Sequence, residues 1–202
     1  MRTKSVFKPA LLSLIAFALL VTSAGPAEAK KEKREPIEKF KARAISLDRG
    51  AAKNLDITIF GWTTPEERQA LLQTFVDGGS KALYKALEKE TVKGYLKLPN
   101  TLGYDMQYAF QFEVEGKRRI VLATDRPLGF LELARSSRST DYNVSLVVLD
   151  LDPETGEGEG QATGGAELSI KDGKLQIEYV GTQPTRLTNV KPVALKKKKG
   201  KE

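Results

Sequence analysis

The chain of 202 residues contains neither cysteine nor histidine. Without these side chains it has no Ser-His-Asp or Cys-His nucleophile system, no zinc site of nitrogen and sulfur ligands, and no haem held by His or Cys. No glycine-rich phosphate loop follows a strand and opens a helix. Any catalysis is restricted to carboxylate, lysine or tyrosine chemistry. We therefore expect no cofactor and favour a protein that is not an enzyme.

Long apolar runs are also scarce, and the longest lies near the N-terminus. Arg2, Lys4 and Lys8 precede the apolar stretch 9–21, which is followed by the small-residue motif Ala27-Glu28-Ala29. This arrangement is typical of a secretory signal peptide, with cleavage predicted after Ala29. The run is shorter than the roughly 20 residues that a spanning helix needs. The sequence thus predicts a periplasmic or secreted protein without a membrane span.

The positive charge is concentrated at the ends of the chain. Of the formal net charge of +7, residues 30–39 contribute +2 and residues 196–202 contribute +4, whereas residues 40–195 hold 20 basic and 21 acidic side chains. This balance argues against nucleic acid as the main partner. The Lys-rich tail is interpreted either as a solubilising disordered end or as a weak contact with an anionic envelope surface.

The stretch 104–125 has the most regular pattern. Apolar side chains occupy every second position of its first half: Tyr104, Met106, Tyr108, Phe110, Phe112 and Val114. Strict alternation predicts a strand with one buried and one wet face. Glu115-Gly116 supplies a turn into a second strand, so the stretch predicts an antiparallel hairpin.

Two further signals are local. Thr64, Pro65 and Glu67 are typical of a capping box at a helix start, Gly78-Gly79 of a helix end, and Ser80 of the start of a second helix. Asp172-Gly173 predicts a hairpin between strands 161–170 and 174–181. Its register places Ile170 opposite Leu175, Leu168 opposite Ile177, and Ala166 opposite Tyr179.

These patterns predict an α+β, mainly β fold. It is a curved antiparallel meander, an open barrel or a strongly bent sheet, with a pair of short helices after the first strands. The predicted organisation is a signal peptide at 1–29, a charged flexible leader at 30–39, a single β-rich domain at 40–195 and a Lys-rich disordered tail at 196–202.

Three sets of residues are candidate sites. The first is aromatic and could line an apolar cavity for a lipid-like ligand, although an ordinary filled core is the simpler interpretation. It comprises Tyr104, Met106, Tyr108, Phe110 and Phe112. The second is basic and suits phosphate or carboxylate oxygens, although a polar loop is the simpler interpretation. It comprises Arg126, Arg135 and Arg138.

The third set is an acidic turn with a partial calcium-loop pattern. Asp150, Asp152 and Glu154 fall at alternate positions, but Thr155 stands where such a loop needs glycine and Gln161 where it needs a bidentate glutamate. A solvated hairpin connection is therefore the favoured interpretation, and we expect no metal.

The segment from about Asp125 to Val190 resembles small exported bacterial proteins of unassigned function. The matching features are Thr124-Asp125-Arg126-Pro127, the Gly156-Glu157-Gly158 turn, and the run from Gln183 to Val190. The resemblance covers the C-terminal half of the chain and assigns no role to any residue.

The sequence favours an exported, non-catalytic domain that binds an apolar small molecule or, on an exposed strand edge, an envelope partner. The alternatives are a structural or accessory envelope protein without a ligand site and a hydrolase that uses paired carboxylates. Neither the ligand nor the oligomeric state follows from the residues.

Overall fold

The structure, a computed structural model of the chain, describes residues 34–45, 52–100, 102–126, 128, 144–163, 166–171, 174–179 and 184–195. Between residues 164 and 183 the description covers the backbone alone. The predicted signal peptide, residues 30–33 of the leader and the Lys-rich tail lie outside these ranges.

The described residues form one helix and eleven strands. In chain order these are β1 (Glu38–Ile45), β2 (Ala52–Ile59), α1 (Pro65–Leu87), β3 (Gly94–Lys97), β4 (Tyr104–Met106), β5 (Tyr108–Val114), β6 (Lys117–Thr124), β7 (Ser145–Leu151), β8 (Gly158–Thr163), β9 (Ala166–Lys171), β10 (Lys174–Tyr179) and β11 (Thr185–Pro192). The first strand begins within the segment predicted to be a flexible leader. Helix α1 is not apolar enough to cross a membrane.

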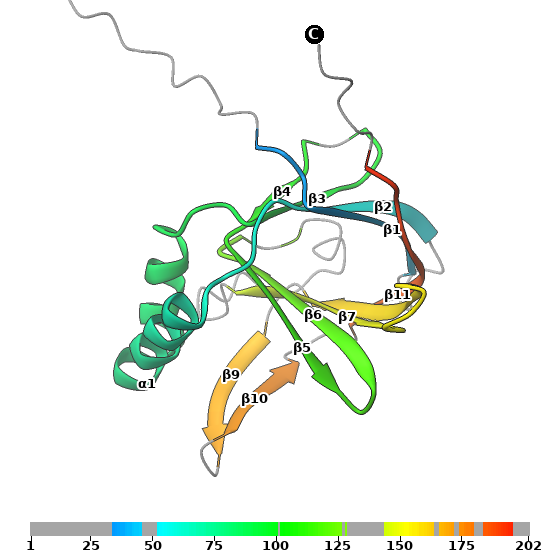
Figure 1. Ribbon diagram of the computed structural model, residues 1–202. Coiled ribbons are helices and arrows are strands. Elements are labelled where there is room, and N and C mark those ends of the chain that lie inside the picture. Colours follow the sequence, from blue (N-terminus) through cyan, green and yellow to red (C-terminus); the bar gives the residue numbers. More distant parts are fainter. Residues whose placement is uncertain are drawn as a thin grey trace, which may run out of the picture. The chain divides into compact units, whose positions relative to one another are not determined.

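Nine of the strands form one antiparallel sheet in the order β4-β3-β2-β1-β11-β8-β7-β6-β5. It consists of two consecutive meanders, β1–β4 and β5–β8, and β11 joins them by pairing with both β1 and β8. The end strands β4 and β5 are consecutive in the chain, with Gln107 alone between them. The sheet is therefore strongly curved and nearly closed (Figure 1), which confirms the predicted mainly β fold with a curved meander.

The predicted long strand of the central hairpin is interrupted at Gln107. Its backbone N–H donates to the carbonyl of Ala123, although Ala123 is already the ladder partner of Tyr108. An extra residue in one strand is a β-bulge, and it reverses which side chains face the core. Met106 before the bulge and Ala109 after it both lie in the core. The prediction of one buried face along the whole stretch is thus wrong.

The turn of this hairpin forms as predicted. Glu115 and Gly116 both have positive φ, of 52° and 72°. Two such residues make the tight turn whose twist matches that of the flanking strands.

One kinked helix stands where a pair of helices was predicted. Thr64 and Glu67 form the reciprocal capping box, with N···O distances of 2.8 and 3.2 Å. Gly79 adopts φ 67° and ψ −166° inside α1, a conformation that costs glycine little. The predicted helix end is therefore a kink, and α1 continues to Leu87.

Two apolar clusters hold the fold together. The concave side of the sheet is filled by one packed cluster to which both meanders contribute, with Ile57, Leu96, Leu122 and Leu149 all fully buried. The second cluster lies between α1 and the outer face of the second meander, where Leu71 and Phe75 pack with Leu146. The helix therefore covers the outside of the curved sheet.

The hairpin of β9 and β10 confirms the register predicted from Asp172-Gly173. All three predicted pairs occur, from Ile170 opposite Leu175 to Ala166 opposite Tyr179. The strand predicted at 161–170, however, is two strands. Residues up to Thr163 belong to β8 of the large sheet, whereas β9 pairs with β10 in a separate two-stranded sheet.

Candidate functional site

The bulge at Gln107 divides the five aromatic and apolar candidate residues into two groups. Met106 is fully buried in the core of the sheet, and Tyr104 packs against that core. Tyr108, Phe110 and Phe112 lie on the opposite, outer face of β5. The structure thus brings together three of the five, and it places them outside the curved sheet.

These three residues form a continuous aromatic row. The ring centroids of Tyr108 and Phe110 are 6.3 Å apart, and those of Phe110 and Phe112 are 6.1 Å apart. Tyr108 lies under α1, while Phe112 at the other end is 42% exposed. The row therefore runs from a covered to an open part of the outer face.

A cation from the helix lies on this row. The guanidinium carbon of Arg68, in the first turns of α1, is 5.0 Å from the centroid of the Phe110 ring. This is the distance of a cation–π contact. Burial raises the pKa of Tyr108 above its ordinary value, and the charge of Arg68 opposes that shift. Arg68 therefore joins the helix to the aromatic row electrostatically.

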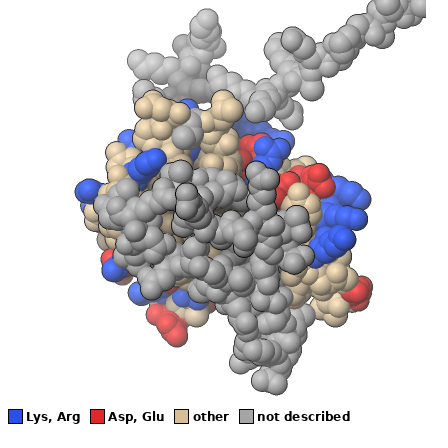
Figure 2. Space-filling view, turned by 180° about the vertical axis from the view of Figure 1, so that it is seen from behind, with Lys and Arg blue, Asp and Glu red and all other residues tan. Residues whose placement is uncertain are grey.

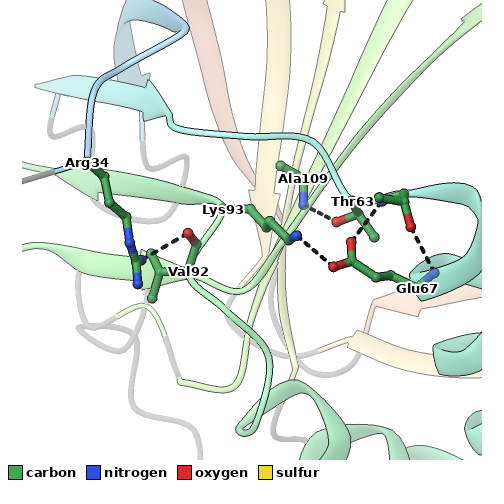
Figure 3. A network of polar contacts seen from close by, with 7 residues as sticks. Arg34, Thr63, Glu67, Val92, Lys93 and Ala109 are labelled. Atoms are coloured by element: carbon green, nitrogen blue, oxygen red, sulfur yellow. Dashed lines mark hydrogen bonds and ion pairs between the residues drawn. The ribbon is translucent and has the colours of Figure 1, made fainter. Parts of the chain in front are cut away.

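The free edge of β5 lies beside the row. Thr63 pairs with the first part of this edge: its N–H donates to the carbonyl of Ala109 at 2.6 Å, and its side-chain oxygen accepts from the N–H of Ala109 at 3.0 Å (Figure 3). Because backbone groups alternate along a strand, the N–H and C=O of Gln111 and Glu113 point to the same side. Within the described part of the chain, no backbone partner meets these four groups.

A polar network fixes the helix start at one end of this edge (Figure 3). Lys93 donates to Glu67 at 2.8 Å, and Glu67 also accepts from the N–H of Thr64. The Lys93 ammonium, followed by the Thr64 N–H, holds the pKa of Glu67 below its ordinary value. Arg34 donates to the carbonyl of Val92 next to Lys93. The network ties the first turn of α1 to the chain before β3.

A second network lies on the concave side of the sheet near its rim. Arg118 donates to Gln111 at 2.7 Å and to Glu38 at 2.6 Å, and its guanidinium carbon is 5.7 Å from the centre of the Trp62 ring. Glu38 belongs to β1 and Arg118 to β6, strands that are not neighbours in the sheet. This ion pair therefore bridges the two meanders.

The acidic candidate residues do not gather into a metal site. Asp150 is held by Arg119 through two hydrogen bonds of 2.6 and 2.9 Å. Asp152 accepts from Glu154 and from Thr155 in a local turn, and the hydrogen bonds from Thr155 lower the pKa of its carboxyl. Among the described residues, no group of three acidic side chains is arranged to hold a metal ion.

The basic candidate set falls largely outside the described chain. Arg135 and Arg138 are not in the described ranges. Arg126 is exposed, and its backbone N–H donates to the side-chain oxygen of Thr124 at 3.2 Å. The predicted anion site therefore stays a prediction.

Sequence reasoning missed Arg68 and Arg118. A signal existed for Arg118, because it precedes Ile120 and Leu122 at the period of a strand and so shares their inward face. No comparable signal existed for Arg68, because its contact with Phe110 depends on where α1 packs.

Both signs of charge occur on the described surface, as the view from behind shows (Figure 2). No family model, curated protein or solved structure matches this chain. The resemblance of residues 125–190 to small exported proteins stays a prediction. The functional interpretation therefore rests on the geometry of β5 and its surroundings.

Proposed function

We propose that the protein is an exported, non-catalytic binding domain that takes an extended peptide segment of an envelope partner onto the free edge of β5. The observation that carries this proposal is the edge itself. β5 ends the nine-stranded sheet, and the backbone groups of Gln111 and Glu113 point away from β6. A peptide that adds a strand there gains main-chain hydrogen bonds without any rearrangement of the sheet.

The contact with Thr63 supports the proposal that backbone groups on this edge of β5 can form hydrogen bonds with an added segment. Thr63 is not part of a strand, yet it meets both backbone groups of Ala109 at hydrogen-bonding distance. Thr63 is also buried, so this interaction is shielded from water. An incoming strand continues the same pattern from Gln111 towards the hairpin turn.

Side chains on the two faces of β5 set the preference for the peptide sequence. On the outer face, Phe110 and the exposed Phe112 offer apolar contact to alternate residues of an added strand. On the inner face, Glu113 is exposed and favours a basic residue at the positions between them. The edge therefore fits a short strand that alternates apolar and basic side chains.

The other hypotheses have less support from the geometry. A lipid-like ligand inside the sheet competes with the packed core cluster for the same space. A carboxylate hydrolase needs two coupled acids, whereas Glu38, Glu67 and Asp150 are each paired with a cation. A structural role without a ligand does not explain why Phe112 is exposed beside backbone groups that have no partner in the described part of the chain.

Amide hydrogen exchange tests the proposal directly. We expect the amides of Gln111 and Glu113 to exchange rapidly in the protein alone and to become protected when a Val-Lys-Val-Lys-Val-Lys peptide is added. Glu113→Pro removes one outward donor and should abolish this protection at Gln111, whereas Glu113→Ala keeps the donor and removes only the charge, so protection should persist in weakened form. Unchanged exchange of both amides at saturating peptide would contradict strand addition.

A further inference from the structure

The outer face of the first meander carries cations in a regular arrangement. On β1, Phe40, Ala42 and Ala44 are buried in the core, so Lys39, Lys41 and Arg43 point outward. Within the described chain, no carboxylate forms an ion pair with any of these three side chains. β1 therefore presents a row of three outward cations, of which Lys41 has the carboxylate of Asp56 as its register partner on β2.

The neighbouring strands β11 and β3 carry further cations beside this row. Lys41 is the register partner of Lys191 on β11 and of Asp56 on β2, and Asp56 is in turn opposite Lys97 on β3. The described acids on this face and at its border include Asp56, Asp105 on β4, and Glu157, which is paired with Lys191 at 3.2 Å. Cations thus outnumber acids on this face, although residues 40–195 are nearly neutral overall.

The register also brings the two ends of the described domain together. The N–H of Val193 donates to the carbonyl of Lys39, which continues the pairing of Phe40 with Pro192. Continued by two residues on each segment, this register would place Leu195 opposite Ile37. Both are large apolar side chains that remain exposed, Ile37 at 43% and Leu195 at 38%.

In the sequence, Ile37 has the acids Glu35 and Glu38 as well as cations nearby, whereas Leu195 is followed by cations. Arg34 precedes Ile37 by three positions, and Leu195 is followed at once by four consecutive lysines, Lys196 to Lys199. We therefore group the two exposed apolar side chains with the outward cations of β1, because Ile37 and Leu195 each lie two positions from the bonded residues Lys39 and Val193. We call this the basic corner: Ile37, Leu195, Lys39, Lys41 and Arg43.

We propose that the basic corner docks the protein onto the surface of an anionic phospholipid membrane. Cations near such a surface are attracted by its negative potential, and exposed apolar side chains can enter the interface between headgroups and acyl chains. The two exposed apolar residues favour a membrane over a soluble anionic polymer, which offers no apolar layer to receive them. This surface lies on the first meander and is separate from the edge of β5.

Vesicle co-sedimentation of the exported chain tests this docking. Wild-type protein should bind vesicles of phosphatidylcholine mixed with phosphatidylglycerol, but not vesicles of phosphatidylcholine alone. Each cation contributes roughly fivefold in affinity, so Lys39→Gln, Lys41→Gln and Arg43→Gln together should weaken binding on the order of a hundredfold. Binding should also fall steeply with added salt, because the Debye length shrinks from about 10 Å at 0.1 M to about 3 Å at 1 M.

A matched control removes the same charge from another exposed face. Lys81→Gln, Lys85→Gln and Lys89→Gln, at the C-terminal half of α1 and just beyond it, should leave the affinity within about twofold of wild type. An equal loss in both triple variants would overturn the proposal, because it would mean that net charge alone drives binding. Absence of wild-type binding to the anionic vesicles would also overturn it.

A second variant separates the membrane from an anionic polymer. Ile37→Ser with Leu195→Ser should weaken vesicle binding and leave binding to soluble polyphosphate unchanged. If the pair has no effect on vesicle binding and polyphosphate binds as tightly as vesicles, the corner recognises an anionic polymer and the membrane proposal fails. Circular dichroism of every variant verifies that the fold is retained.

Discussion

The two meanders share an inward face of buried apolar residues and differ in what they place outside. The outer face of β1 carries the exposed Lys41 and Arg43 and the half-buried Lys39, none of which forms an ion pair with a carboxylate of the described chain. The outer face of β5 to β7 instead carries the aromatic row, with Arg68 over Phe110, and there Arg119 is paired with Asp150. The same alternating pattern of strands therefore produces one charged and one aromatic surface.

We infer that the inward side chains, with the outward residues buried under α1, carry most of the stability of the fold. Both meanders contribute residues to the inner cluster, so each meander depends on the other to bury its inward side chains. Among the described residues, the outward side chains of the second meander pack against one another and against α1. Substitutions of inward side chains should therefore lower the free energy of unfolding more than substitutions of exposed outward side chains.

The largest effect should come from truncation of the shared interior. Ile57→Ala in the first meander and Leu149→Ala in the second each remove a fully buried side chain. We expect each to lower the free energy of unfolding by about 2–5 kcal/mol, from lost burial and the cavity left behind. Urea unfolding measures it, and Lys41→Ala on the outer face should change stability by less than about 0.5 kcal/mol. A large difference between the losses of Ile57→Ala and Leu149→Ala would show that the two meanders do not contribute equally to the stability of the core.

An intermediate effect should follow from loss of the bridge between the meanders. Arg118→Ala removes hydrogen bonds to Glu38 and Gln111 and leaves the carboxylate of Glu38 without this cation. We expect a loss of about 1–3 kcal/mol, the range for partly buried hydrogen bonds to charged groups. In a double-mutant cycle with Glu38→Gln, additive losses would show that the two residues do not interact in solution.

The smallest effect should be a pH dependence at the helix start. The pKa of Glu67 is lowered in the folded protein from an ordinary value of 4.5, so its stabilising contribution is complete above that value and is lost as the pH falls through the lowered folded pKa. The difference in unfolding free energy between wild type and Glu67→Gln should therefore be constant near pH 7 and shrink below pH 4.5. A difference that stays constant down to low pH would show that the carboxylate is not stabilised by Lys93.

Local signals in the sequence predicted local structure well. The capping box at Thr64 and the register set by Asp172-Gly173 both form, because each depends on residues close together in the chain. The pair of helices became one kinked helix, since Gly79 interrupts the helical conformation without ending the element. The strand predicted at 161–170 was divided because its two parts pair with different partners.

The candidate site was less predictable, because it depends on contacts between distant residues. The alternation from Tyr104 to Val114 is unbroken in the sequence, so nothing in it marks Gln107 as a bulge. The bulge arises where β4 pairs with β3 while β5 pairs with β6, and this divided pairing moves Phe110 and Phe112 to the outer face. Likewise, the charge total of residues 40–195 gave no indication of the cationic row on β1.

By itself the sequence determined which chemistries the protein lacks, the strand periodicity that makes it mainly β, and the turns and caps that begin its elements. These are properties of composition and of neighbours along the chain. Only the tertiary structure decided which face each strand turns inward, that β5 is the end strand of the sheet among the described residues, and that Val193 pairs with Lys39 of β1. Those outcomes follow from the pairing of strands far apart in the chain, because curvature, register and bulges are set by all strands of the sheet together.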